Sequence, residues 1–457
     1  MDSFRKLGTN QASLCIPNLM SFSNRSERFF LWLACFFVSI LFLLECSLYG
    51  QAIYSLDDCI RIALENKPDV KIARLRVQSS IAERRGSLSN ILPRVSYSLG
   101  YLNQGSYIDP IFDMPTSEKE FHSAGISLSQ NIFDGGQWWN QIASANSAYR
   151  YSRELEMETR VTIVLNVKQA FYQYLKDLQL LDVTEQSVEL AKQQLELVRH
   201  QYEVEAVART DLLKQQVQLG NMEVEFLNQQ AVTRNSFNQL ANAMGLGVGA
   251  DFSVVDSPGP ISPPVKSFDV LLEKAKRDNP TLMTQQTQIT NSELGLKIAR
   301  ANYFPSLSLS MGYDGSSTML DELYSDDKRW RLQTRLSISY PLFTGFLQST
   351  QVEVAKVDYK IEQENYQNLL RDLEVELDFT VEQLVNLGKM IPIFEETKKS
   401  AEEDLRLAQE RYNLGAATIL DVLDSQLSVT SANSSLVRAI YDEKILRAQL
   451  DALLGEL

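Results

Sequence analysis

The chain contains an internal duplication, which constrains its fold more than any other feature of the sequence. The stretch QERYNLGAATILDVLDSQ at 409–426 aligns without a gap with HQYEVEAVARTDLLKQQ at 200–216, at a shift of about 210 residues. In this alignment Tyr202 pairs with Tyr412. Each stretch joins two long helical patterns across a short turn. We therefore predict a duplicated helical hairpin whose tips are these two stretches.

The outgoing arm of the first hairpin is predicted to be one very long helix. Between 137 and 202 the chain has neither proline nor glycine, and its apolar residues recur every three or four positions, as in a coiled coil. At about 1.5 Å per residue, such a helix is near 100 Å long. The return helix from Asp211 and a helix predicted at 55–90 are each about half that length, so we expect them to stack end to end beside it.

Prolines predict where the helices break. Ser55 is a candidate N-cap, and Pro68 predicts a break into a short and a longer helix. The same pattern recurs at 267–302, where Pro280 matches Pro68. Pro392 lies inside the second long helix and predicts a kink.

A different periodicity precedes each long helix. In 93–101 and again in 305–313, aliphatic residues and tyrosine alternate with serine and glycine, and the segments 126–132 and 335–342 alternate similarly. Strands of about 9–11 residues match the reach of a tilted strand across a bilayer. Because open sheet edges are costly in hydrocarbon and four strands cannot close a barrel, several copies of the chain must contribute. The alternative is a soluble four-stranded sheet with one wet face.

The N-terminal residues 1–52 are predicted to be a signal segment. An apolar run at 29–44 is short for a spanning helix and suits a secretory signal, with cleavage expected after Ala52. Met20 is an alternative start, and Cys46 is an alternative lipidated first residue. We predict a first structural repeat at 53–246, a proline- and glycine-containing linker at 247–266 and a second repeat at 267–457.

Composition excludes several classes of function. Once the signal segment is removed, the only cysteine is Cys59 and the only histidines are His122 and His200. These side chains are too few for a disulfide framework or for a Cys/His metal site. Carboxylates fall on predicted solvated helix faces, so we expect no enzyme, no cofactor and no metal. The net charge of −14 argues against nucleic acid as a partner.

Taken together, the ordered and duplicated motifs resemble the TolC-type outer-membrane efflux proteins over about 55–457. The resemblance rests on Leu92-Pro93 and Phe304-Pro305 before the strands, on the turns Phe133-Asp134-Gly135-Gly136 and Phe343-Thr344-Gly345, and on the RYxxGxxTxxDVLD pattern at 411–424.

This resemblance implies a mainly α fold with a membrane β-barrel portion. A homotrimer would form a 12-stranded barrel in the outer membrane and an α-helical tunnel through the periplasm. It also implies a passive channel subunit of a tripartite efflux pump or type I secretion system. Its partners would be an RND, ABC or MFS inner-membrane transporter and a periplasmic adaptor (membrane fusion protein). The alternative function is a periplasmic coiled-coil scaffold or adaptor subunit without a pore.

The second tip carries the predicted pore gate. Asp421 and Asp424 lie on one helix face at i and i+3, and threefold symmetry would turn each into a carboxylate ring that favours cations. The alternative is that they only complement the N-terminal dipole of their helix. The resemblance implies that Tyr412 holds the tips shut by bonding to the other hairpin near Asp211.

The basic residue that the family has between the tyrosine and the aspartates is absent, because Ala417 stands in its place. Arg209 on the other hairpin is a candidate to replace its charge. The adaptor would dock on the two tips, at Tyr202, Val204, Ala206, Thr210, Leu414, Gly415 and Thr418.

Overall fold

The computed structural model describes residues 52–456, with gaps at 107, 110, 112–113, 116–118, 248, 257–265 and 326–329. The predicted signal segment, with Met20 and Cys46, lies outside the described residues except for its last residue. The chain divides into two units, and the described residues of the smaller one are Ala52, Ile53 and Asp251–Ser253. It carries most of β1 (Ala52–Tyr54) and β6 (Phe252–Val254), which pair as a two-stranded sheet. Periodicity did not predict β6, which falls within the stretch expected to be a linker.

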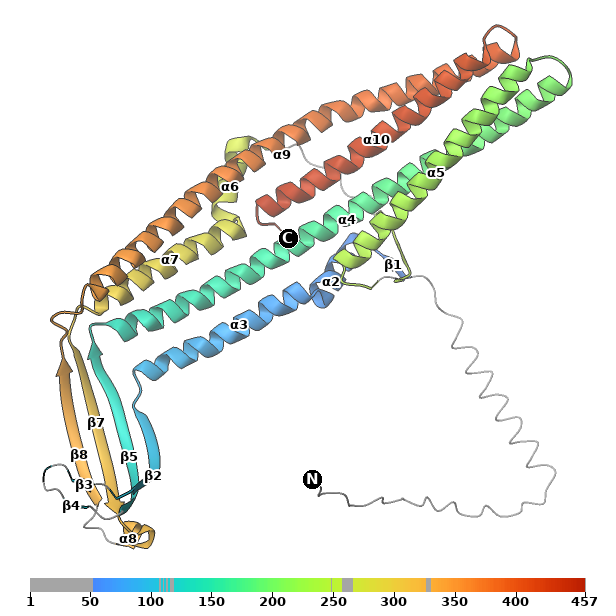
Figure 1. Ribbon diagram of the computed structural model, residues 1–457. Helices are drawn as coiled ribbons and strands as arrows, with labels where there is room; N and C mark the ends of the chain where they lie inside the picture. The colour runs from blue at the N-terminus through green and yellow to red at the C-terminus, as the bar shows by residue number, and fades with distance from the viewer. Residues whose placement is uncertain are drawn as a thin grey trace, which may run out of the picture. The chain divides into compact units, whose positions relative to one another are not determined.

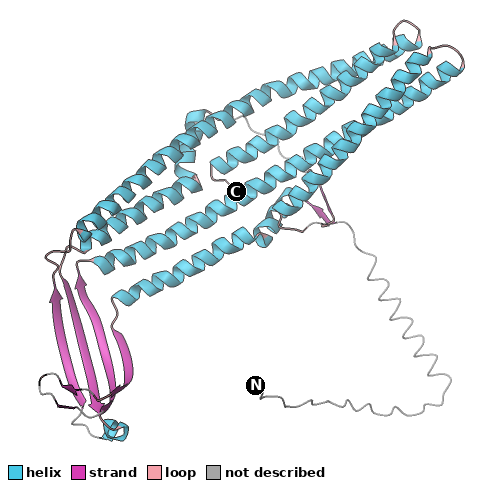
Figure 2. Cartoon of the chain, viewed as in Figure 1, coloured by secondary structure: helices cyan, strands magenta, loops and turns pink. Residues whose placement is uncertain are grey.

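The larger unit repeats one plan twice (Figures 1 and 2). The main elements of the first half are α2 (Leu56–Asn66), α3 (Pro68–Ser87), η2 (Leu88–Asn90), β2 (Arg94–Gln104), β5 (Lys119–Asp134), α4 (Gln137–Glu203) and α5 (Arg209–Ala243). Those of the second half are α6 (Phe268–Asp278), α7 (Pro280–Ala301), β7 (Ser306–Ser317), β8 (Trp330–Ser339), α9 (Leu347–Asn413) and α10 (Ile419–Leu453).

The helix breaks follow the sequence signals. The Ser55 side chain accepts a hydrogen bond from the Asp58 amide at 3.3 Å while the Asp58 carboxylate accepts one from the Ser55 amide at 3.2 Å, so the predicted N-cap is a full capping box. Pro68 and Pro280 each occupy the first position of a helix, where the missing amide costs nothing. The predicted breaks are therefore confirmed.

The expected stacking of short helices beside each long one is also confirmed. Both α4 and α9 have 67 residues, and both return helices have 35. The end of α5 meets the break between α2 and α3, where a Cβ on Gly245 would lie 3.2 Å from the Asn66 Cβ. The end of α10 meets the break between α6 and α7 in the same way, because a Cβ on Gly455 would lie 2.2 Å from the Asp278 carbonyl oxygen.

Apart from the pairing of β5 with β7, the two halves pack on each other through α4, which contacts both α7 and α10. Lys168 pairs with Asp451 at 3.3 Å, and Lys176 pairs with Asp442 at 2.9 Å. Leucines dominate the largest cluster in the second half, where α6, α7, α9 and α10 meet; its buried members are Leu271, Ala275, Leu282, Leu373, Leu377, Leu384, Leu450 and Leu454. The helix α9 continues through Pro392 without interruption, and the kink there stays a prediction. No described helix is both long enough and apolar enough to cross a membrane.

The four long strands form one antiparallel sheet in the order β2-β5-β7-β8. One side, here called the apolar face, presents exposed side chains that include Val95, Tyr97, Leu99, Ile126, Tyr313, Leu332, Leu336 and Ile338. The opposite side, here called the serine face, carries Ser96, Ser98, Ser127, Ser129, Ser308 and Ser310 in the alternating register. The strands β2 and β8 are the two edges of this sheet.

Some local elements differ from the sequence prediction. The last strand ends at Ser339, so Tyr340 and Leu342 lie beyond it although their alternation suggested a continuation. The loop after β2 contains the short strands β3 (Ile108–Asp109) and β4 (Met114–Pro115), and the loop after β7 contains α8 (Leu320–Ser325). These elements were not predicted because they are too short to show a periodicity.

Candidate functional site

The two helical hairpins turn at the end of the larger unit opposite to the strands (Figure 1). We call 201–211 the first tip and 411–421 the second tip. Both end their outgoing helix with the same paired hydrogen bonds, which satisfy the last carbonyl groups. The bonds join Glu205 N to Tyr202 O (2.9 Å) and Ala206 N to Gln201 O (2.8 Å) in the first tip, and Gly415 N to Tyr412 O (2.9 Å) and Ala416 N to Arg411 O (2.8 Å) in the second.

This geometry requires a left-handed residue directly after the helix cap. In the second tip the residue is Gly415, with φ of 72°, which glycine adopts without steric cost. In the first tip it is Glu205, with φ of 59°, one of only two non-glycine residues with positive φ in the described chain. Gly415 belongs to the RYxxGxxTxxDVLD pattern found in the sequence, whereas nothing in the sequence marked Glu205.

The start of the return helix also differs between the tips. Thr418 caps α10, and its amide and hydroxyl both donate to the Asp421 carboxylate, at 2.7 and 2.8 Å. These two bonds lower the pKa of Asp421 below its ordinary value. Ala208 occupies the equivalent position before α5 and has no side chain that could cap it. The capping role that we left open as an alternative for Asp421 is therefore present, and it does not prevent the exposed carboxylate from also facing a pore.

Tyr412 connects the two tips. Its hydroxyl donates to the Gln201 side-chain oxygen at 3.0 Å, so the bond to the other hairpin exists, with Gln201 as the partner. Partial burial raises the pKa of Tyr412, and the negative charge of Asp211 raises it further. Asp211 therefore lies near the tyrosine, as expected, without accepting its proton. Gln201 was missed because it is one of several glutamines along a polar helix face, and no spacing singles it out.

The remaining predicted gate residues do not meet in a single cluster. Asp424 is exposed one turn beyond Asp421. Arg209 is exposed, and within the described chain its guanidinium makes no ion pair with any carboxylate. Arg411, on the same tip as Asp421, does contribute to lowering the pKa of Asp421. It partly fills the role for which Arg209 was suggested.

The predicted docking residues form an exposed crown on the tips. Val204 is 74% exposed and Leu414 is 83% exposed, which is unusual for large apolar side chains at two matching positions. Tyr202 is also exposed, as are Ala206, Thr210, Gly415 and Thr418. A pocket of about 220 Å³ opens between the hairpins just behind the crown, lined by Leu190, Gln193, Gln194, Leu197, Gln409, Tyr412 and Asn413.

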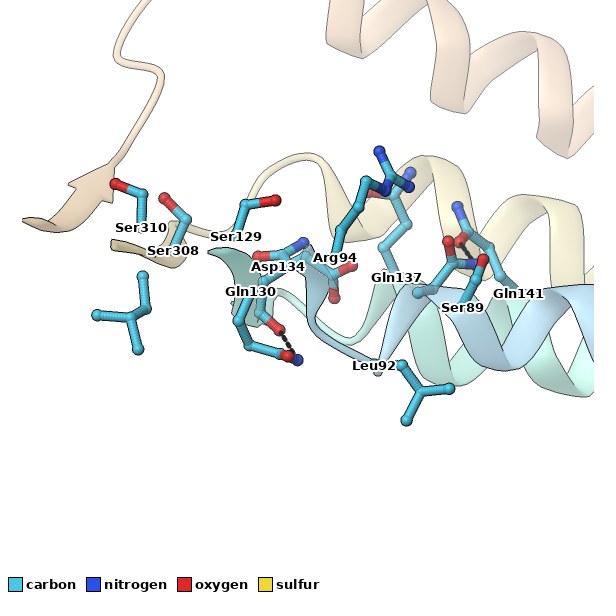
Figure 3. Close-up of a pocket in the computed structure, with 13 residues that line it drawn as sticks. Ser89, Leu92, Arg94, Ser129, Gln130, Asp134, Gln137, Gln141, Ser308 and Ser310 are labelled. Carbon is cyan, nitrogen blue, oxygen red and sulfur yellow. Dashed lines mark hydrogen bonds between the residues drawn. The ribbon is translucent and has the colours of Figure 1, made fainter. Parts of the chain in front are cut away.

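A second polar pocket, of about 430 Å³, lies where the strands meet the helices. Figure 3 shows Arg94, Ser129, Ser308 and Ser310 on one side of the sheet there and Leu92 on the other. Gln137 and Gln141 of α4 complete the polar side. Among the described residues, no group of three or more His, Cys, Asp or Glu side chains is placed to hold a metal ion.

Comparison with known proteins decides what kind of molecule has this architecture. The family model described as "Outer membrane efflux protein" matches residues 59–246 and 271–456. These segments correspond to the two halves of the larger unit.

The chain belongs to the outer membrane efflux protein family.

Individual relatives are distant but cover almost the full length. Outer membrane protein TolC of Vibrio cholerae serotype O1 is 24% identical over 411 residues, which span 86% of this chain and 89% of TolC. The probable outer membrane lipoprotein SilC of Salmonella typhimurium is 22% identical, over 86% of this chain and 84% of SilC. The crystal structure of CusC matches the fold with a TM-score of 0.80 at 19% identity, over 90% of this chain and 96% of CusC.

Family membership and the likeness to CusC confirm the predicted fold class, a mainly α chain of the helical-tunnel type with a smaller strand portion. Family membership also confirms that the chain is an outer membrane channel subunit of efflux pumps. Nothing in these comparisons supports a poreless periplasmic scaffold.

Proposed function

We propose that three copies of this chain form one outer-membrane exit duct that is closed at the helix tips. The observation that carries the proposal is the sheet order β2-β5-β7-β8, which leaves both β2 and β8 as open edges beside an exposed apolar face. In hydrocarbon, an edge must be paired, and an apolar face belongs against lipid. Pairing β8 of one copy with β2 of the next satisfies both conditions with twelve strands.

The gate in this proposal lies at the second tip. Three copies of exposed Asp421 and Asp424 would surround the axis at the narrow end of the tunnel and favour cations. The hydrogen bond between Tyr412 and Gln201 links the two hairpins of one protomer. It therefore favours the arrangement in which both tips lie together, and opening requires that it break.

The exposed crown of the tips is the proposed docking surface for a periplasmic adaptor. Val204 and Leu414 supply matching apolar contacts from the two hairpins. Since the family's channels are passive ducts, we propose that the adaptor connects this one to an inner-membrane transporter of the RND, ABC or MFS type. The repeat boundaries at 53–246 and 267–457 stay predictions, and so does lipidation at Cys46. Because SilC is named a probable lipoprotein, lipidation at Cys46 is worth testing.

Planar-bilayer recording of the purified protein tests the gate. With Asp421→Ala and Asp424→Ala combined, we expect the reversal potential in a KCl gradient to move toward that of an unselective pore, because the carboxylate rings are gone. Tyr412→Phe should raise the resting conductance while leaving selectivity unchanged. The same cation selectivity in the double variant and in the wild type would remove these aspartates from the pore.

A further inference from the structure

The serine face of the sheet carries its own pattern of charge. Strand register places Arg94, Ser129, Ser310 and Arg335 in one transverse row across all four strands. Two rows farther from the helices, on the same face, lie Ser98, Gly125, Asp314 and Arg331. Alternation along β8 puts Arg331 and Arg335 on the same side as the serines.

These three arginines are exposed, and none of them forms an ion pair with a carboxylate of the described residues. On this face, between the row of Arg94 and the row of Arg331, Asp314 is the one acidic residue among the described strand residues. This part of the face, from the row of Arg94 to the row of Arg331, has three arginines and one aspartate, which is unexpected in a chain with a net charge of −14.

Asp314 is held close to the sheet surface. A Cβ on Gly125 would lie 2.0 Å from its Oδ1 atom, and a Cβ on Gly312 would lie 2.6 Å from its Oδ2 atom. The carboxylate therefore rests above two glycines, where no side chain stands between it and the strands. Its register partner on β8 is Arg331, so this one carboxylate offsets at most one of the three positive charges.

The polar pocket at the base of the strands adds a hollow beside one of these arginines. Arg94 lines it together with Ser129, Ser310 and Gln137, which offer hydrogen-bond donors. The carboxylate in this pocket, Asp134, accepts hydrogen bonds from the Trp138 amide at 3.1 and 3.2 Å, so its charge is directed at the start of α4. The pocket thus combines a guanidinium group with neutral donors, which is the chemistry that binds anions.

We propose that the barrel lumen of this channel binds anions, and that its cargo includes organic anions bearing sulfonate, phosphate or carboxylate groups. The proposal rests on the trimeric barrel of the proposed function, in which the serine face lines the lumen. Threefold symmetry then makes Arg94, Arg331 and Arg335 three rings of positive charge. Low-dielectric walls focus the field of such rings and raise the local concentration of counter-ions. The exit end therefore has the opposite charge preference to the acidic tips.

The test is equilibrium binding of a fluorescent polyanion, pyrene tetrasulfonate, to the purified trimer, followed by fluorescence anisotropy at low salt. Replacing all three arginines by glutamine should weaken binding about tenfold or more, which is the lower end of what focused fields provide. Replacing them by lysine should keep most of the affinity, since the charge is retained. Asp314→Asn should tighten binding, and Asp421→Ala with Asp424→Ala should leave it unchanged.

Equal binding by the glutamine variant and the wild type would overturn the proposal, and so would a wild-type trimer that binds no dye. Because these residues are exposed on a strand surface, the variants should fold and assemble like the wild type. The trimer itself is checked first by its migration on an unboiled gel. A protein that never forms a trimer contradicts the proposed function, whereas a trimer without arginine-dependent binding contradicts only the anion site.

Discussion

The two hairpin tips have the same backbone but use it differently. The second tip has the optimal residue at each special position, with Gly415 in the left-handed conformation and Thr418 forming a capping box with Asp421. The first tip has Glu205 and Ala208 at the matching positions, so it bears a strained residue and lacks the cap. Duplication has preserved the turn, while local stabilisation is confined to one copy.

The difference also separates the roles of two matching aspartates. Asp421 is engaged by Thr418, so its carboxylate is fixed at the start of α10. Asp211 has no capping threonine, and its charge acts instead on Tyr412 of the other hairpin. The second tip is therefore predicted to be the rigid half of the gate. The first tip is predicted to be the half that opens locally. Its Gln201 accepts the hydrogen bond from the Tyr412 hydroxyl.

Substitutions at the left-handed position should have the largest effect on the difference between the two tips. We expect Gly415→Glu to destabilise the second tip by about 1–2 kcal/mol, the cost of a side chain in this conformation. Hydrogen exchange measured by mass spectrometry should then show about tenfold faster local opening of peptides from the end of α9.

The matched control is Glu205→Gly, which should slow exchange at the end of α4 by a smaller factor, because glycine also loses more entropy on folding. If Gly415→Glu left exchange in the second tip unchanged, the left-handed residue would not be what separates the two tips.

Substitutions at the helix cap should have a smaller effect on local opening. They can be made in both directions, by removing the cap of α10 and by adding one to α5. Thr418→Ala should cost about 1 kcal/mol and speed exchange in the first turn of α10 about fivefold. Ala208→Thr should do the reverse in α5, because Asp211 already occupies the third helical position needed to complete a capping box. Ala208→Val, which adds bulk without the hydroxyl, is the control. If threonine and valine had equal effects at 208, capping would not explain the difference.

The sequence predicted the regular parts of this molecule because periodicity and prolines specify them locally. The capping signal at Ser55 and the breaks at Pro68 and Pro280 depend only on neighbouring residues, and the long helices show many repeats of one pattern. Elements of two to six residues, such as α8, lack that redundancy.

Contacts between hairpins were harder to predict. Gln201 and Tyr412 are 211 positions apart, and their hydrogen bond depends on how α4 and α9 pack. The suggestion of Arg209 as a substitute cation came from its position alone, and Arg411 acts on Asp421 instead because it lies on the same tip. The arginines of the serine face were not recognised either, because strand register, not spacing, brings them into rows.

We propose that the open sheet edges β2 and β8 are closed by other copies of this chain in the outer membrane. Single-particle electron microscopy of the protein extracted from that membrane tests it most directly. We expect three protomers that share one twelve-stranded barrel, with β8 of each beside β2 of the next. A lone protomer whose apolar sheet face packs against its own helices would contradict this proposal.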